Sequence, residues 1–173
     1  EFVSVGGILM KYNGNEENLI IPDNIRAISA CVFYECNTLK SVKLPDGISE
    51  IFAGTFYSCT NLETVIMPDS LIKIRLSAFE KCTSLKNVIF GRNLRNIHGA
   101  AFAGCTSLKE LTIPDTVRVI EQHAFANCTS LEKVTLSENT FISRRIFYGC
   151  EKIHIYSSQT GNEITDWYNG ITY

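Results

Sequence analysis

The chain has 173 residues, of which 45% are hydrophobic and 20% charged, and its formal net charge is −2. This composition is that of a folded protein and excludes a disordered chain. The near-neutral charge and the lack of a basic run argue against nucleic-acid binding. No apolar run approaches the roughly 18 residues that a membrane-spanning helix needs.

Residues 1–21 are predicted to form an N-terminal cap. The segment "VSVGGILMKYNGNEENLII" contains two dipeptides, Gly6-Gly7 and Asn13-Gly14, that are typical of hairpin turns. An open end of a repetitive fold exposes apolar core and strand edges. We therefore expect a β-hairpin, followed by a first strand, to cover the end of the fold.

Residues 22–153 contain about six units with a period of 23 residues, as the related phrases "FAGCTSL" and "FANCTSL" illustrate. One unit reads C-x-x-L-x-x-V-x-L-P-x-x-I-x-x-I-x-x-x-x-F-x-x. The recurring phenylalanines are Phe33, Phe56, Phe79, Phe102, Phe125 and Phe147. The recurring cysteines, three residues later, are Cys36, Cys59, Cys82, Cys105, Cys128 and Cys150. The last unit is one residue short, since Phe147 follows Phe125 after 22 residues. A period kept over so many units indicates stacked coils whose matching side chains lie on top of one another.

Each unit predicts one short strand, one turn and a second extended piece. In the first full unit Val42 and Leu44 point inward and Ser41 and Lys43 outward, which is the alternation of a strand. Proline then ends the strand because it has no N–H for the ladder. A second extended piece follows at 49–51, and the phenylalanine and cysteine lie on a tight or short helical turn. The predicted fold is a β-rich solenoid with a spacing of about 4.8 Å between coils.

Residues 154–173 are predicted to form a C-terminal cap, beginning with a last strand. Thr160 and Glu163 have the spacing of a helix capping box. The helix that follows would place Ile164 and Trp167 on one face, over the last coil.

The repeat units resemble the 23-residue leucine-rich repeat of BspA-like bacterial surface proteins, most closely in "SAFEKCTSLKNVIF" and "AAFAGCTSLKELTIP". The opening "GGILMKYNGNEENLIIPDNI" resembles the N-terminal hairpin of such proteins. The resemblance implies a right-handed leucine-rich repeat superhelix, which we expect to be a single domain over residues 1–173. It also implies secretion or display on a bacterial cell surface. Gly91 and Ser137 depart from the pattern, because both replace the proline.

Seven cysteines raise the question of disulfides or metal. Sulfurs in one line cannot converge on a zinc ion, and parallel side chains are not aimed at one another for bridging. We expect a column of free, buried thiols that donate weakly to backbone carbonyls, and no cofactor. Cys31 stands outside this column, at a position where small residues recur; a reactive thiol is the alternative.

The sequence favours a non-enzymatic protein. His98, His123 and His154 have no cysteine, serine or aspartate partner at a recurring spacing, so no catalytic triad is predicted. No phosphate-binding glycine pattern is present either.

The outward strand positions are the candidates for binding. One column is Ile20, Lys43, Ile66, Ile89, Thr112, Thr135 and His154, and the other is Asn18, Ser41, Thr64, Asn87, Glu110, Lys133 and Lys152. Candidate ligand-binding residues are Lys43, Ile66, Ile89, Thr112 and Thr135. An apolar pair with a polar rim is typical of a protein-binding face, although β-branched residues also face water in ordinary strands. The tyrosines Tyr34, Tyr57 and Tyr148 form a second candidate surface.

The leading hypothesis is a monomeric surface module that recognises a protein or a glycan, through adhesion or a similar contact. The alternative is a structural spacer inside a larger secreted protein.

Overall fold

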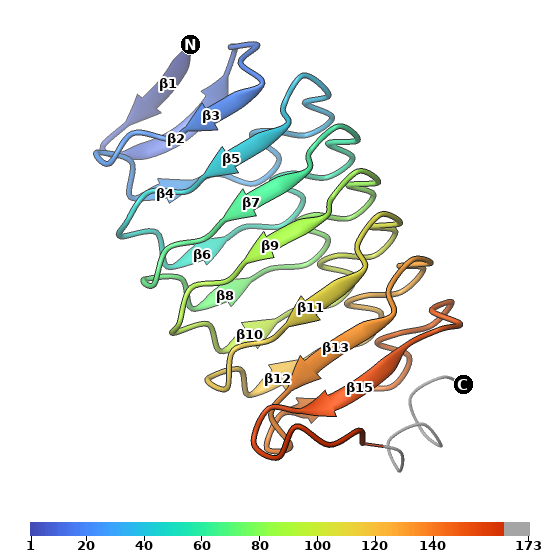
Figure 1. The fold of residues 1–173 in the computed structure, drawn as a ribbon. Coiled ribbons are helices and arrows are strands. Elements are labelled where there is room, and N and C mark those ends of the chain that lie inside the picture. Colours follow the sequence, from blue (N-terminus) through green and yellow to red (C-terminus); the bar gives the residue numbers. More distant parts are fainter. Residues whose placement is uncertain (165–173) are drawn as a thin grey trace.

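The computed structural model describes residues 1–164. The chain winds into a solenoid in which each coil adds one strand to a front face and one to a back face (Figure 1). Between the back strand and the next front strand lies the turn with phenylalanine and cysteine. This turn is closed by bonds such as Cys36 N to Phe33 O, 3.0 Å. No helix is present in the described part, so the expectation of short helical turns is wrong; successive turns, each closed by a bond from residue i+3 to residue i, connect the back strand to the next front strand.

The front face carries seven strands in two parallel ladders. The first ladder is β3 (Asn18–Ile20), β5 (Ser41–Lys43), β7 (Thr64–Ile66) and β9 (Asn87–Ile89), and the second is β11 (Glu110–Thr112), β13 (Lys133–Leu136) and β15 (His154–Ser157). Within each ladder equivalent repeat positions pair, for example Val42 with Val65 and Val65 with Val88. The middle residue of each strand points into the core and its neighbours point outward.

The back face carries the two-residue strands that follow the turn at proline or, for β10 and β14, at Gly91 and Ser137. They are β4 (Ala27–Ile28), β6 (Glu50–Ile51), β8 (Lys73–Ile74), β10 (Asn96–Ile97), β12 (Val119–Ile120) and β14 (Phe141–Ile142). β6 to β14 form one continuous parallel ladder, whereas β4 belongs to a separate sheet with the N-terminal strands. The prediction of a second extended piece at 49–51 is confirmed by β6.

The N-terminal hairpin consists of β1 (Phe2–Val5) and β2 (Ile8–Tyr12), joined at Gly6 and Gly7. Both glycines have positive φ, as the turn requires. β2 pairs in parallel with β4, so the hairpin and β4 form a three-stranded sheet at the N-terminal end of the back face. Asn13-Gly14 does not form the second hairpin that the sequence suggested, because the strand that follows joins the front ladder instead of β2.

The core is a set of side-chain columns that run along the solenoid. The six repeat phenylalanines are buried and stacked, with ring centroids 4.9–5.7 Å apart between successive coils. Tyr12 packs on Phe33 at 5.1 Å and Phe2 on Tyr12 at 5.4 Å, so the hairpin extends the aromatic column to the N-terminal end. The ring spacing follows the coil spacing, which strand pairing sets.

Five cysteines form a second buried column beside the phenylalanines. Each thiol donates to the carbonyl of the phenylalanine in the preceding coil, at 3.0–3.3 Å between sulfur and oxygen. The cysteines are Cys59, Cys82, Cys105, Cys128 and Cys150, and all are free. Cys36, at the start of the column, is only partly buried and lies 3.7 Å from the Thr38 hydroxyl.

Each turn also contains two residues with left-handed backbone. One such column is Cys31, Gly54, Ser77, Ala100, His123 and Arg145, all with φ between 52° and 61°. The sequence suggested that small size governs this position. The shared feature is the positive φ, because large side chains such as Arg145 occupy it as well.

We expect Ala100→Gly to stabilise the protein by about 1 kcal/mol, because a left-handed conformation costs a residue with a Cβ more than it costs glycine. Ala103, in the same coil and equally half-buried, does not have positive φ. Ala103→Gly should therefore destabilise the fold by roughly 0.4–1 kcal/mol. Urea unfolding of the two variants checks this, and equal effects would contradict the conformational explanation.

At the C-terminal end β15 pairs with β13 in a register that the sequence did not predict. His154 lies beside Lys133, and Tyr156 beside Thr135. His154 therefore belongs to the second outward column and Tyr156 takes its place in the first, because the last unit is shorter. The predicted helix is wrong in its first turn, since Glu163 forms an antiparallel bridge with Tyr156; the rest of that helix lies outside the described residues.

Candidate functional site

The outward residues of the front strands form two aligned columns. Lys43, Ile66 and Ile89 are neighbours across β5, β7 and β9, and Thr112 is the neighbour of Thr135 across β11 and β13. Ile66 is 37% exposed and Ile89 52% exposed. The five predicted positions therefore lie on one face, but in two groups that belong to different ladders.

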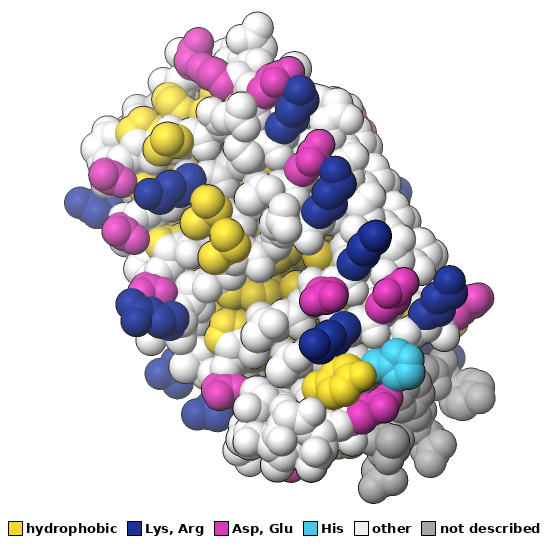
Figure 2. All heavy atoms as spheres, viewed as in Figure 1, with side chains coloured by type: hydrophobic (Ala, Val, Ile, Leu, Met, Phe, Trp, Pro, Cys, Tyr) yellow, Lys and Arg dark blue, Asp and Glu magenta, His cyan; other side chains and the backbone are white. Residues whose placement is uncertain are grey.

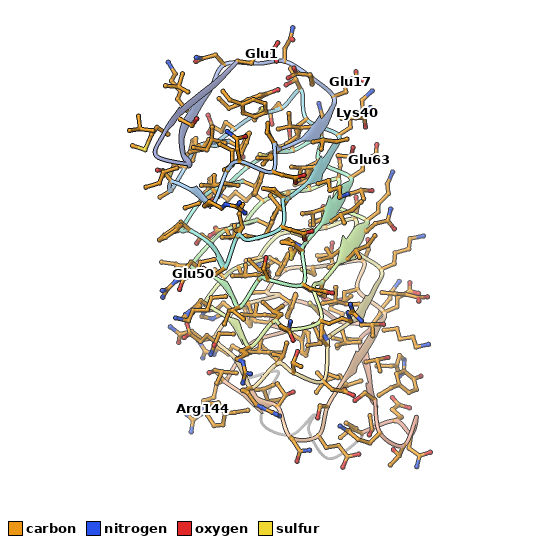
Figure 3. All side chains as sticks on the ribbon, turned by 90° about the vertical axis from the view of Figure 1, so that its left-hand side faces the viewer. Glu1, Glu17, Lys40, Glu50, Glu63 and Arg144 are labelled. Carbon is orange, nitrogen blue, oxygen red and sulfur yellow. The ribbon has the colours of Figure 1, made fainter. Side chains whose placement is uncertain are left out.

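A charged column borders this face where the chain enters each front strand. It consists of Glu17, Lys40, Glu63, Lys86, Lys109 and Glu132, one residue per coil. Lys40 bonds Glu17 at 2.8 Å and Lys86 bonds Glu63 at 3.0 Å. The hydrogen bond with Glu17 raises the pKa of Lys40. Figure 3 shows Glu17, Lys40 and Glu63 following one another along one side of the solenoid, with Glu50 on the other side.

The alternation of acidic and basic residues along this column ends at Lys86 and Lys109, because both of these neighbouring positions hold lysine. Lys109 has no ion pair within the described residues. Figure 2 shows the acidic and basic side chains of this border together with hydrophobic side chains on the front face. The like charges meet where the two front ladders separate.

The front face is interrupted between β9 and β11. No backbone ladder joins these strands in the described chain, although β7–β9 and β11–β13 pair normally. A cavity of about 610 Å³ opens here, lined by Lys86, Asn87, Ser107, Lys109, Glu110 and Ser130. A second cavity of about 390 Å³ adjoins it and is lined by Thr64, Lys86, Asn87, Val88, Ile89, Glu110, Leu111 and Thr112. Figure 2 shows the front face hollowed at this level, with hydrophobic side chains at the bottom.

Two residues distinguish the coil at this interruption from the others. Phe90 occupies the inward position that holds Leu44, Met67 and Ile113 in other coils, and its ring packs edge-on against Phe102, on the turn that leads to β11, at 5.9 Å. Gly91 follows, and a Cβ at this residue would lie 1.9 Å from the Pro68 carbonyl oxygen. The bulky ring and the close approach of Gly91 to Pro68 thus coincide with the point where the front ladder is interrupted.

The tyrosine surface is smaller than the sequence suggested. Tyr34 and Tyr57 stack at 5.1 Å, and the Lys81 ammonium lies 5.2 Å from the Tyr57 ring. Tyr148 lies in a distant coil, edge-on to His123 at 6.5 Å. The structure therefore brings two of the three tyrosines together. Cys31 is exposed, and its sulfur lies 3.8 Å from the Ala53 carbonyl oxygen.

Within residues 1–164 no histidine side chain forms a hydrogen bond with a thiol or a serine hydroxyl. His98 Nδ1 lies 2.9 Å from Glu121 Oε1, and His154 Nδ1 lies 2.6 Å from Glu163 Oε1. Among residues 1–164 no three histidine, cysteine or acidic side chains come together as metal ligands. The front face presents hydrogen-bonding groups, charges and, between β9 and β11, an apolar floor.

Comparison with known proteins places the chain in a family. The description "BspA type leucine rich repeat region (6 copies)" matches residues 9–132 and 95–168. The chain belongs to the BspA-type leucine-rich repeat family. The resemblance inferred from the 23-residue period is thereby confirmed.

Three solved structures of leucine-rich repeat proteins are similar to this BspA-type chain. A protein of T. pallidum has 30% identity and a TM-score of 0.79, over 87% of this chain and 75% of its own. One from Bacteroides ovatus has 30% identity and a TM-score of 0.73, over 87% of this chain and 42% of its own. A cell surface protein of Faecalibacterium prausnitzii has 25% identity and a TM-score of 0.69, over 90% of this chain and 50% of its own.

No curated protein matches this BspA-type chain. Within the described residues no helix has the length and apolar character to span a bilayer.

Proposed function

We propose that this BspA-type repeat is a non-enzymatic recognition module of a bacterial cell surface, and that its front face binds a partner protein. The observation that carries the proposal is the alignment of exposed Ile66 and Ile89 on adjacent strands, beside a row of charged residues. An exposed apolar pair with a polar rim is the arrangement of many protein-binding surfaces. The cell surface protein of F. prausnitzii supports the location.

The rigidity of the solenoid suits this role. Each front strand pairs with at least one neighbour and packs on a core that is continuous through the coils, so the outward side chains are fixed before binding. Preorganised side chains lose little conformational entropy when they meet a partner. The ion pairs of Lys40 and Lys86 are exposed and contribute little to stability, so they are available for contacts with a partner.

We predict that the double variant Ile66→Asp and Ile89→Asp loses partner binding by at least about tenfold in Kd, because two charges would be buried in the interface. Partners are first captured from bacterial and host surface extracts, identified, and produced in pure form. Binding is then measured by calorimetry, and circular dichroism verifies that the variant is folded.

Leu76→Asp is the matched control. Leu76 is 57% exposed but does not lie on a front strand, so its substitution should leave binding unchanged. Equal binding by the wild type and the double variant would overturn the assignment of binding to this face, whereas failure to capture any partner would support the spacer hypothesis.

A further inference from the structure

We propose that the opening between β9 and β11 is a binding site for an extended peptide segment of a partner, which inserts as an additional strand in the front sheet. This inference rests on the proposed function and specifies where on the front face recognition takes place. Three observations support it: unpaired backbone groups, an apolar floor and an unbalanced positive charge.

The backbone groups at the opening lack the partners that equivalent groups have elsewhere. At the junction of β5 and β7, the amides of Glu63 and Thr64 donate to Lys40 O, at 2.7 and 3.2 Å. At the next junction Lys86 N and Asn87 N donate to Glu63 O in the same way.

The equivalent amides at the opening are those of Lys109 and Glu110, and neither has an acceptor within the described chain. The same holds for Phe90 N, whose counterpart Met67 N donates to Ile89 O at 2.9 Å. Two strand edges therefore face each other with free donors and acceptors. An extended polypeptide satisfies such edges along their length, because its own N–H and C=O groups alternate with the same spacing.

The floor of the opening is apolar and offers a contact surface for a side chain of the inserted segment. Val88 and Phe90 are half-buried, whereas the matching residues Val65 and Met67 are buried. A cavity of about 610 Å³ lies within the size range of ligand sites. An apolar side chain of the inserted segment would cover Val88 and Phe90 and remove their surface from water.

The charged residues at the mouth of the opening indicate which charge the partner peptide carries. Lys86 and Lys109 stand on opposite sides of the opening, and Lys109 has no acidic partner in the described residues. Glu110 is the acidic group of the same lining. The partner segment is therefore an extended peptide with an apolar residue for the floor and an adjacent carboxylate for Lys109.

The back face contains a comparable interruption between β4 and β6, which serves as an internal control. Its cavity is smaller, about 260 Å³, and is lined by Ile8, Ala27, Ile28, Ser29, Ala30 and Phe52. None of these lining residues is charged, so this cavity cannot select a peptide by its charge as the front opening does.

The probe for the test is a random library of eight-residue peptides displayed on phage and selected on the wild-type chain. We expect enriched peptides to combine an apolar residue with Asp or Glu. In the isotope-labelled protein, a selected peptide should slow hydrogen exchange of the Lys109, Glu110 and Phe90 amides by at least about tenfold. Exchange at Phe52 should not change.

Two variants complete the test. Phe90→Leu restores the aliphatic residue of other coils and should let β9 and β11 pair, which weakens peptide binding by at least about tenfold. Phe52→Leu, the same substitution on the back face, should bind as the wild type does. Lys109→Glu keeps the opening and should discriminate against acidic peptides.

The proposal is overturned if no peptide is enriched, or if the protected amides lie elsewhere. It is also overturned if Phe90→Leu binds as tightly as the wild type. The Ile66→Asp variant distinguishes the proposed function of the front face from the proposed peptide site, because Ile66 does not line either front cavity. Loss of the protein partner in this variant, together with failure of the peptide test, would leave the front face as the binding surface and exclude the opening.

Discussion

Replacing Phe102 with alanine should lower the free energy of unfolding by about 3–5 kcal/mol, the range measured for buried aromatic side chains. Phe102 is fully buried. It stacks on Phe79 at 5.1 Å and on Phe125 at 5.4 Å, and Phe90 packs edge-on against it. Its removal therefore leaves a cavity bordered by three rings.

The position of the cavity makes the loss larger than its volume alone suggests. The front ladder is already interrupted between β9 and β11, so the coils on either side are joined by the back ladder and by the core columns. Phe102 lies on the turn between β10 and β11, where the chain passes from one front ladder to the other. We expect Phe102→Ala to reduce the coupling between the two halves of the solenoid, since a repeat fold is stabilised by contacts between nearest neighbours.

Urea unfolding measures this effect, and Phe141→Ala is the control. Phe141 is 66% exposed, so its replacement should change the free energy by no more than about 0.5 kcal/mol. Weakened coupling predicts a lower urea m-value or a second transition for Phe102→Ala. A loss below about 1 kcal/mol would contradict a close-packed aromatic column, because a relaxed core would tolerate the cavity.

The fold could be predicted from the sequence because its period is visible in single residues. Phe33 and Phe56 recur at the same interval as Val42 and Val65, and side chains that recur together must occupy equivalent places in successive coils. The core columns and the outward positions of the front strands follow from this alone. The register of β15 did not follow, since the shortened last unit moved His154 beside Lys133.

The interruption between β9 and β11 was missed for a related reason. Reasoning from a period treats every coil as equivalent, so Phe90 counted as one more apolar residue in its column. The signal was present in the sequence: Phe90 is larger than its counterparts and is followed by Gly91 in place of proline. Whether a larger ring is accommodated or separates two coils depends on packing against Phe102, which requires coordinates.

The left-handed column shows the same limit. Cys31, Gly54 and Ser77 suggested a restriction on size, but the restriction is on φ. Residue type indicates backbone conformation only weakly, because several residues other than glycine adopt positive φ at a modest energetic cost.

The buried thiols should react at least about 10³-fold more slowly than Cys31 with a thiol-specific reagent, because labelling needs opening of the fold, and the open fraction is about 10⁻³ or less. Burial raises the pKa of the Cys105 thiol, so the reactive thiolate is suppressed in the folded protein. Cys31 is exposed and Cys36 partly so. We expect one or two thiols to react in native protein at pH 8, and all seven in denaturant.

The labelling rates of the thiols distinguish a structural cysteine column from one with a redox function. Cys31→Ser should remove the fast phase, while Cys105→Ala should remove one slow thiol and lower stability, because the Phe79 carbonyl loses a donor at 3.3 Å. Mass spectrometry after labelling in denaturant counts the free thiols. A deficit of two in non-reduced protein would indicate a disulfide and would contradict a column in which each sulfur faces a carbonyl rather than its neighbour.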